Sequence, residues 1–379
     1  MLLETKFGFE VLHRSKKSGA KVGRIHTPHG IIDTPGFVAV GTNGSLKSLE
    51  NEMVNQIGLQ LMFCNTYHLM LQPGTEVVKK AGGLHKFINR DKPIITDSGG
   101  FQVFSLAYGS VANELKSAGK KQSGNSVLKI SEEGVKFRSY RDGKLILLTP
   151  ETSIQAQKDL GADIIIPFDE LPPYHVDPKY LKRSLERTHR WEKRSFEEHM
   201  KNPNGQAMYA VIHGGTDIDL RIHSYETLSK LDFDGFAIGG SMGKTKAQMW
   251  YMLNGLMPHL PDDKPNHLLG IGDLESIEAC IPLGIDTFDS AYPTKAARHG
   301  TLLTSQGKKK LSSGTNALQF GPIEKGCECP TCKNYSLAYI HHLFKAKELT
   351  AMSLASIHNL YYMVEWMRKR RQMILDDEV

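Results

Sequence analysis

The sequence predicts a (β/α)8 barrel, an α/β fold in which eight parallel strands close into a ring and helices cover the outside. Short apolar stretches recur along the chain, and each ends in glycine, asparagine, aspartate or another polar residue. Amphipathic helical patterns separate most of them, which is typical of parallel strands buried on both faces. About eight such units within 379 residues fit a closed barrel better than the alternative, an open doubly wound sheet.

The expected strands leave room for a helix between most neighbours. We place them at residues 36–42, 61–68, 93–100, 162–170, 208–215, 235–240, 267–272 and 285–290. Helices are predicted over residues 152–160 and 177–201, and the segment before residue 36 is a polar opening. Active sites of such barrels lie at the carboxyl ends of the strands, so the polar strand ends should face one common mouth.

Composition is that of an ordinary soluble globular protein, with 40% hydrophobic and 23% charged residues. The formal net charge of +6 and the pI near 8.8 favour a polyanionic partner such as a nucleic acid, without requiring one. Apolar runs stay well short of the roughly 18 residues of a membrane span, and the N-terminus lacks a signal-peptide core. We therefore expect a cytoplasmic protein with no membrane partner.

Three of the five cysteines are crowded near the C-terminus, as Cys327, Cys329 and Cys332. In a reducing compartment this pattern indicates a metal site rather than disulfides. Three thiolates at C-x-C-x2-C spacing can surround one tetrahedral ion, and a helix can return a fourth ligand. The spacing does not decide between His341 and His358. Four protein ligands would leave no open position, so we predict one structural rather than catalytic metal ion per chain.

The predicted domains follow from these patterns. Residues 1–310 should form the barrel, and residues 311–379 a metal-binding subdomain with C-terminal helices packed on the barrel. A segment near residues 109–129 is rich in Ser, Gly and Lys and poor in large apolar residues. It predicts a mobile surface loop inserted after the third strand.

Acidic residues follow three of the predicted strands: Asp97, Asp169 and Asp289. One such acid is usually a cap or turn residue, but three at the same end of a barrel favour an active site. A carboxylate held there can act as a nucleophile or a general base. Lys295 and Arg298 follow Asp289 and would suit a phosphate-bearing substrate, the alternative being a solvated surface.

Several motifs occur in a fixed order along the chain: DSGGFQ, FDE followed by Pro and Tyr, AIGG, FD-x3-PT[KR]-x2-R-x-G, C-x-C-x2-C and AYIHHL. Their order and intervals closely resemble the tRNA-guanine transglycosylases of the bacterial and eukaryotic type, over nearly the whole chain. The resemblance implies a (β/α)8 barrel with a zinc-binding subdomain. It also implies exchange of guanine at the anticodon wobble position of tRNA for a 7-deazaguanine base without ATP, by a homodimer.

The same resemblance implies roles for individual residues. Asp289 corresponds to the nucleophile, Asp97 to the general acid/base and Asp169 to the residue that reads the guanine-like edge of the base. The other matched positions assist in base reading (Ser98, Gly239, Gly240), sandwich the base (Phe101, Leu269), contact the anticodon loop (Lys295, Arg298) or bind zinc (Cys327, Cys329, Cys332, His358). The glycines also have a physical rationale, because they let the backbone approach a flat ligand closely.

The implied chemistry agrees with the residue types. Replacing a base with retained configuration at C1′ needs two displacements, so a carboxylate first forms a covalent ribosyl-enzyme. A second group must then deprotonate the incoming base. Reaching the wobble base requires splaying it out of the anticodon loop, as RNA-reading proteins commonly do.

The chain departs from the family pattern around the base. His213 replaces a usual glutamine, and Leu171 replaces a usual bacterial cysteine. Where bacterial members read GGLAVGE and eukaryotic ones GGLSGGE, this chain reads GGSMGK, with Ser241, Gly243 and Lys244. A lysine in place of an acid would repel the cationic side chain of 7-aminomethyl-7-deazaguanine, and Ser241 could bond a diol. We therefore expect queuine to be preferred, with the aminomethyl base possible.

Two other functions compete with this one. A non-catalytic tRNA-binding subunit is disfavoured because Asp97, Asp169 and Asp289 are all present. A barrel metallohydrolase unrelated to tRNA would need histidine and carboxylate ligands at the mouth, and the expected H-x-H strand signature is missing from the sequence.

Overall fold

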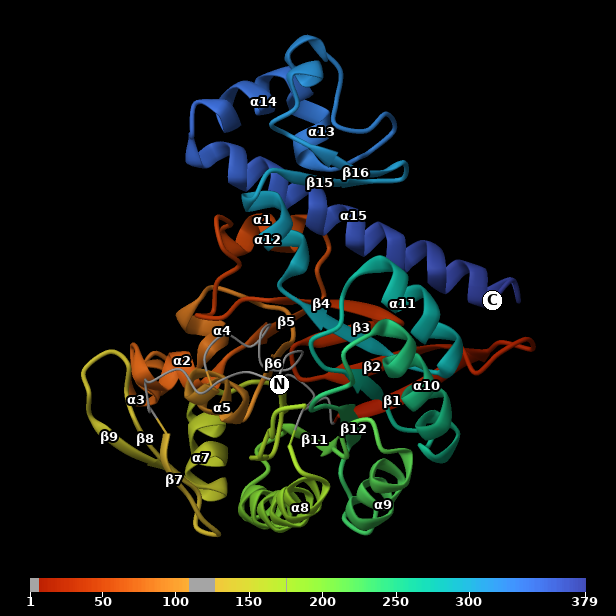
Figure 1. The fold of residues 1–379 in the computed structure, drawn as a ribbon. Coiled ribbons are helices and arrows are strands. Elements are labelled where there is room, and N and C mark those ends of the chain that lie inside the picture. Colours follow the sequence, from red (N-terminus) through yellow and green to blue (C-terminus); the bar gives the residue numbers. More distant parts are fainter. Residues whose placement is uncertain (1–6, 109–126, 175) are drawn as a thin grey trace, which may run out of the picture.

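The computed structural model describes residues 7–108, 127–174 and 176–379. Eight parallel strands of this part close into a barrel in the order β10-β11-β12-β13-β14-β4-β5-β6 (Figure 1). They are Gly36–Val40 (β4), Leu61–Cys64 (β5), Ile94–Thr96 (β6), Ile164–Ile165 (β10), Ala207–Ile212 (β11), Gly235–Ile238 (β12), Asn266–Leu268 (β13) and Thr287–Ser290 (β14). All eight predicted strands and the fold class are confirmed. Seven of these strands end earlier than predicted, because their polar ends leave the hydrogen-bonded ladder and form loops at the mouth, whereas β14 ends where predicted and begins two residues later.

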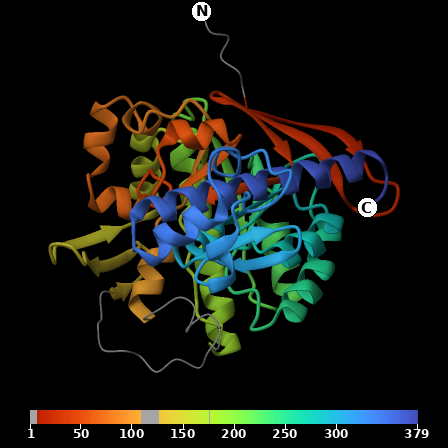
Figure 2. The same cartoon turned by 90° about the horizontal axis from the view of Figure 1, so that it is seen from above.

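Helices surround the barrel on the outside (Figure 2). The helices that precede the last barrel strand, β14, are Asn51–Gln56 (α1), Thr66–Leu71 (α2), Thr75–Lys80 (α3), Leu84–Phe87 (α4), Gly100–Tyr108 (α5), Pro150–Leu160 (α7), Pro178–Met200 (α8), Ile218–Leu228 (α9), Lys246–Leu256 (α10), Leu274–Cys280 (α11) and the 3-10 turns Met257–His259 and Ile281–Leu283. Both predicted helices are confirmed, as α7 and α8. Local chemistry fixes α7: a capping box joins Thr149 and Thr152 at its start, and Gly161 ends it at φ 69°.

The opening that we considered merely polar forms an antiparallel sheet of Gly8–Arg14 (β1), Lys21–Thr27 (β2) and Gly30–Thr34 (β3). Ile25 and Ile32 of this sheet are fully buried and belong to the same cluster as Val38, Leu61 and Ile95 inside the barrel. The sheet therefore closes the amino-terminal end of the barrel and leaves the carboxyl end for a site.

A second small sheet lies between β6 and β10 and consists of Val127–Ile130 (β7), Val135–Arg138 (β8) and Leu145–Leu148 (β9). Most of the predicted inserted loop, residues 109–126, lies outside the described residues. The predicted end of that loop is wrong, because residues 127–129 already belong to β7.

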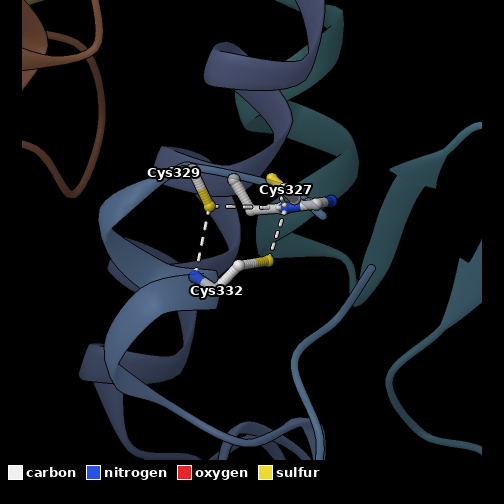
Figure 3. A group of neighbouring side chains, drawn as sticks. Cys327, Cys329 and Cys332 are labelled. Atoms are coloured by element: carbon white, nitrogen blue, oxygen red, sulfur yellow. Dashed lines mark hydrogen bonds between the residues drawn. The ribbon is translucent and has the colours of Figure 1, made fainter. Parts of the chain in front are cut away.

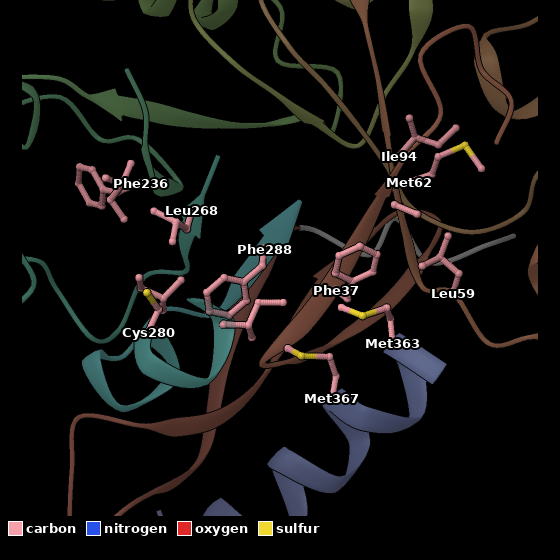
Figure 4. Packing of buried hydrophobic residues seen from close by; sticks show 14 of the residues in the cluster. Phe37, Leu59, Met62, Ile94, Phe236, Leu268, Cys280, Phe288, Met363 and Met367 are labelled. Atoms are coloured by element: carbon pink, nitrogen blue, oxygen red, sulfur yellow. The ribbon is translucent and has the colours of Figure 1, made fainter. Parts of the chain in front are cut away.

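The C-terminal part contains Tyr292–Arg298 (α12), Thr301–Thr304 (β15), Gly307–Lys310 (β16), the 3-10 helix Gly314–Leu318, Pro330–Asn334 (α13), Leu337–Lys345 (α14) and Leu349–Leu375 (α15). The long helix α15 crosses the molecule between this part and the barrel (Figures 1 and 2). Its Met363 and Met367 are buried against the strands that carry Phe37 and Phe288 (Figure 4). Burying each such side chain contributes about 1.5–3 kcal/mol, so α15 is firmly held on the barrel. The domain boundary at residue 310 stays a prediction.

The described helices include none that is both long and apolar enough to cross a bilayer.

Candidate active site and metal centre

The carboxyl ends of the barrel strands surround a cavity of about 730 Å³. Asp97, which follows β6, Asp169, which follows β10, and Asp289, on β14, all line it. The parallel barrel thus brings together three acids that are far apart in the sequence, as predicted from their places at strand ends. Their hydrogen-bond partners differ, so the three carboxyl groups lie in different environments.

Asp97 is buried and strongly held. Its Oδ2 accepts hydrogen bonds from Asn65 Nδ2 (2.7 Å) and Gln102 Nε2 (2.8 Å), and its Oδ1 accepts one from the Thr66 backbone N–H (2.8 Å). Burial raises the pKa of the Asp97 carboxyl to about 6, with a smaller contribution from the charge of Asp169, although the three hydrogen bonds act to lower it. A carboxyl of this pKa can both give and take a proton near neutral pH.

Asp289 is held through one oxygen only. Its Oδ1 accepts hydrogen bonds from the Gly270 backbone N–H (2.7 Å) and from His267 Nε2 (3.2 Å). Oδ2 has no hydrogen-bond partner within the described part of the chain. Asp289 therefore offers one unengaged carboxylate oxygen at a cavity, which is what a nucleophile requires.

Asp169 accepts hydrogen bonds from Ser98 Oγ (2.9 Å) and His213 Nε2 (2.8 Å). The histidine that replaces the family's glutamine thus contacts the acid that should read the base, although it belongs to the wall of a smaller adjacent pocket. Close packing requires the neighbouring glycines: a Cβ on Gly240 would lie 2.8 Å from His213 Nδ1, and one on Gly239 would lie 2.6 Å from a valine methyl.

The predicted sandwich residues and the loop serine line the same cavity. Phe101 lies at the rim and is 39% exposed, whereas Leu269 is half-buried. Ser241 is buried, and its Oγ has no hydrogen-bond partner among the described residues. An unused hydroxyl in the wall can bond a polar substituent of a bound base.

The two predicted RNA-contacting cations lie outside this cavity, on α12. Lys295 is exposed and Arg298 is half-buried. The adjoining hairpin adds basic residues that sequence reasoning missed, among them Lys308, whose Nζ lies 5.2 Å from the centroid of the Tyr292 ring on α12. Together they form a basic surface suited to a phosphate backbone.

Sequence reasoning also missed several buried polar groups that hold the site in place. Asn65 and Gln102 position Asp97, and His267 contacts Asp289. Arg221 is fully buried and donates to the carbonyls of the loops after two barrel strands, at Ile212, Gly215, Gly239 and Ser241. Burial lowers the pKa of this guanidinium to about 9. Gln102 lies within the DSGGFQ motif and Asn65 at the polar end of a predicted strand, so both could have been found, but an arginine within a helix gives no local signal.

The C-terminal cysteines converge with His358 on one point, and Figure 3 shows the three thiols together. The distances from His358 Nδ1 to Sγ of Cys327, Cys329 and Cys332 are 3.7, 3.6 and 3.4 Å. A tetrahedral zinc ion, with Zn–S near 2.3 Å and Zn–N near 2.0–2.1 Å, requires sulfur-to-nitrogen edges of about 3.5 Å. The four groups therefore fit a single metal ion.

A hydrogen bond orients the histidine of this centre. His358 Nε2 lies 2.8 Å from the Leu303 carbonyl, so Nε2–H donates there and the lone pair of Nδ1 faces the sulfurs. His341, the alternative ligand, bonds the Leu311 carbonyl instead. The geometry therefore groups His358, and not His341, with the three thiols.

Another His/Asp group lies at the opposite end of the barrel and consists of His29, His85 and Asp163. Its two rings are nearly parallel (10°) with centroids 3.4 Å apart. Parallel stacked rings cannot both hold one ion in their own planes, so this arrangement does not suit a metal.

A (β/α)8 barrel with three acids around a cavity at its carboxyl end, and with a Cys3His cluster that could hold a metal ion, is typical of a barrel enzyme. Comparison with known proteins identifies the family to which this chain belongs. The family model described as queuine tRNA-ribosyltransferase matches residues 16–379. The chain therefore belongs to the queuine tRNA-ribosyltransferase family, which is a family of pentosyltransferases, and the resemblance stated above is confirmed.

Individual relatives are similar in sequence to this chain over nearly their whole length. The chain is 70% identical to the queuine tRNA-ribosyltransferase of Protochlamydia amoebophila (strain UWE25), over 98% of this chain and 96% of that protein. It is 56% identical to the protein of the same name from Chlamydia muridarum and 54% identical to that of Chlamydia trachomatis serovar D, each over 98% of this chain and 99% of the relative.

Proposed function

We propose that this chain exchanges the wobble guanine of tRNA for a 7-deazaguanine base by double displacement through a covalent bond between Asp289 and C1′ of the ribose. One observation carries the proposal: Asp289, with an unengaged Oδ2, and Asp97, with a pKa of about 6, line the same cavity. A nucleophile and a proton carrier that share one cavity are the minimum that such an exchange requires.

In the first displacement Asp289 Oδ2 attacks C1′, and the bond from C1′ to N9 of guanine breaks. The leaving guanine takes the bonding electrons, and a proton from the Asp97 carboxyl neutralises it. In the second displacement the Asp97 carboxylate removes the N9 proton of the incoming base. N9 then attacks C1′, and the ester to Asp289 breaks. Two inversions leave the configuration at C1′ unchanged, and both acids return to their starting states.

Recognition of the base falls to the groups around Asp169. Its oxygens already accept bonds from Ser98 and His213, so both donors are placed beside the acid that would bind the guanine-like edge. Phe101 and Leu269 would enclose the faces of the ring, and the backbone at Gly239 and Gly240 would approach it closely.

The favoured incoming base is queuine. Lys244 lines the cavity, is exposed, makes no ion pair with a described residue, and lies with Nζ 5.2 Å from the centroid of the Tyr174 ring. The acid Asp273 also lines the cavity, but Lys246 neutralises it at 2.6 Å. The part of the cavity wall formed by Lys244, Lys246 and Asp273 therefore offers an aminomethyl cation little net negative charge. The unpartnered Ser241 hydroxyl remains available to a diol.

Steady-state kinetics with both bases test this preference. We expect a higher kcat/KM for queuine, and a clearly higher value for 7-aminomethyl-7-deazaguanine would contradict it. Placing the bacterial Leu-Ala-Val-Gly-Glu loop after the AIGG strand should shift the preference toward the aminomethyl base.

The Cys3His centre is proposed to hold one structural Zn²⁺. Four protein ligands leave no open coordination position, so the ion would stabilise the C-terminal part rather than take part in the reaction. His358→Ala should lose zinc and lower the thermal midpoint, whereas the control His342→Ala, which changes an exposed histidine on α14, should do neither. Metal analysis showing full zinc in the His358 variant would refute this ligand set.

We further propose a cytoplasmic homodimer that binds the anticodon loop through the basic surface at Lys295 and Arg298. An exposed apolar surface supports the dimer: Leu318 and Phe320 are 77% and 76% exposed, and Ala338 N–H donates to the Gln319 carbonyl, which places them against the start of α14. The stacked rings of Tyr335 and Tyr339 extend the surface. Contiguous apolar surface of this kind marks a protein interface.

Light scattering of purified protein measures the assembly. Phe320→Asp should yield monomers, whereas Tyr251→Asp, 72% exposed on α10 of the barrel, should not. A wild-type monomer at micromolar concentration would contradict the dimer.

Exchange of labelled guanine into tRNA by the purified protein tests the central proposal. Activity, together with a protein–tRNA adduct that survives a denaturing gel, is the expected result. Tight tRNA binding without exchange or adduct would instead indicate a non-catalytic tRNA-binding subunit.

A further inference from the structure

His267 is a fully buried histidine inside the barrel that contacts the candidate nucleophile. It lies on β13, directly opposite Thr287 in the parallel pairing with β14. Since alternate residues of a strand face the same side, Thr287 and Asp289 both point toward His267. Its Nδ1 lies 2.8 Å from Thr287 Oγ1, and its Nε2 lies 3.2 Å from Asp289 Oδ1.

We infer that His267 is a positioning residue that fixes the Asp289 carboxylate in its reactive orientation. This inference rests on the proposed function, because it presupposes that Asp289 attacks C1′. The histidine and the Gly270 N–H both donate to Oδ1. Two donors on one oxygen oppose rotation of the carboxylate, so Oδ2 is presented to the cavity.

The threonine hydroxyl completes this arrangement. A carboxylate oxygen only accepts hydrogen bonds, so the ring proton facing Asp289 must be on Nε2. In the neutral ring Nδ1 is then an acceptor, and the Thr287 hydroxyl donates to it. Thr287 thereby selects the tautomer that can hold Asp289, in the way that partners of one ring nitrogen set the state of the other.

A neutral donor suits both displacements. After the attack Oδ1 is the carbonyl oxygen of the ribosyl ester and can keep both hydrogen bonds. When the ester breaks, the same donors receive the returning carboxylate charge, so no group has to reorient between the two steps. The competing explanation is that His267 only supports the structure, since its ring also stacks on that of Phe63, with the ring centroids 6.3 Å apart.

Isosteric variants separate these roles. The amide of glutamine can reach the place of Nε2, so His267→Gln keeps a donor to Asp289. The amide of asparagine reaches only the place of Nδ1, so His267→Asn keeps the bond to Thr287 and loses that to Asp289. His267→Phe keeps the ring volume and loses both.

The measurement is the single-turnover rate of covalent adduct formation with saturating tRNA, together with KM for the base and the thermal midpoint. We expect the Asn and Phe variants to slow adduct formation on the order of 10²-fold, because small misplacements of a reacting group cost that much. KM for the base should change little, and Gln should restore most of the rate. If the His267→Phe variant does not fold, the comparison of the His267→Gln and His267→Asn variants is sufficient to test the inference.

Two results overturn the inference: an Asn variant that forms adduct at the wild-type rate, or Gln and Asn variants that are slowed equally. Failure of the proposed function gives a different result. In that case wild-type protein forms no adduct, or the Asp289→Asn variant forms it as fast as wild type, whatever residue stands at position 267.

Discussion

Acidic residues stand at both ends of the barrel strands, but they are held differently. At the amino-terminal end Asp163, Asp234 and Asp286 each precede a strand by one residue. Each accepts, at 2.8 Å, a hydrogen bond from a backbone N–H at the start of the neighbouring strand; the donors are Ile94, Met208 and Asn266. At the carboxyl end the acids line a cavity instead. An aspartate next to a barrel strand therefore supports the ladder when it precedes the strand and is available for chemistry when it follows.

The pKa shifts of Asp97 and Asp163 differ in direction, although burial also raises the pKa of Asp234 and Asp286 at the base. Burial raises the pKa of Asp97 to about 6 at the mouth. Burial also acts to raise the pKa of Asp163 at the base, but the hydrogen bond from His29, the contact of His85 Nε2 at 3.1 Å and the charges of these rings outweigh it and lower that pKa well below its usual range. The fold therefore disfavours the charged form of Asp97 and favours the charged form of Asp163.

The largest expected effect is that of Asp289→Asn at the mouth. The asparagine keeps an oxygen for Gly270 and His267 but cannot attack C1′, so exchange should fall by at least roughly 10⁴-fold. Binding of tRNA and the thermal midpoint should remain close to those of the wild type. Exchange of labelled guanine and denaturing gels measure the effect, and adduct at full yield in the variant would refute the nucleophilic role.

Asp97→Asn should be next, with a loss of about 10²–10⁴-fold, the usual contribution of a general acid/base. Its effect on stability depends on pH. Because the folded-state pKa is raised, the folded state binds the proton more tightly, and the resulting stability is lost as pH rises through about 6. Between about pH 4 and pH 8 the wild type should lose on the order of 3 kcal/mol relative to the variant. Denaturant unfolding at both pH values measures this, and a parallel pH dependence would contradict the shift.

The same contrast shows how far the sequence could predict this molecule. Continuous apolar runs indicated all eight barrel strands, and the acids after them indicated the mouth. The sheet of β1–β3 was missed because charged residues such as Glu10, Arg14 and Arg24 interrupt its apolar ones, so no continuous apolar run marks it. His267 and Arg221 were missed because their partners lie on neighbouring strands and loops, and those contacts depend on strand register rather than on local sequence.

Asp163→Asn tests the base of the barrel and should affect stability rather than exchange. Removing a buried charge beside His29 and His85 should cost about 1–3 kcal/mol of unfolding free energy at neutral pH. Because the folded-state pKa is lowered, this contribution is present above the unfolded pKa of about 4 and is lost as pH falls further. Unfolding curves and kcat per folded molecule measure the two effects. A large loss of kcat with unchanged stability would contradict the view that acids at the amino-terminal end of the barrel serve stability rather than catalysis.

The smallest expected effect is that of Asp234→Asn, also at the base. Asp234 accepts from the Met208 N–H, and burial raises the pKa of its carboxyl, so its charge is not favoured by the fold. An asparagine keeps the accepting oxygen, and we expect a change in unfolding free energy below about 1 kcal/mol. Asp234→Ala removes the acceptor and should cost about 1–3 kcal/mol, because the Met208 N–H would then be buried without a partner. Equal losses in the Asn and Ala variants would show that the charge, and not the hydrogen bond to the neighbouring strand, is what the base of the barrel needs.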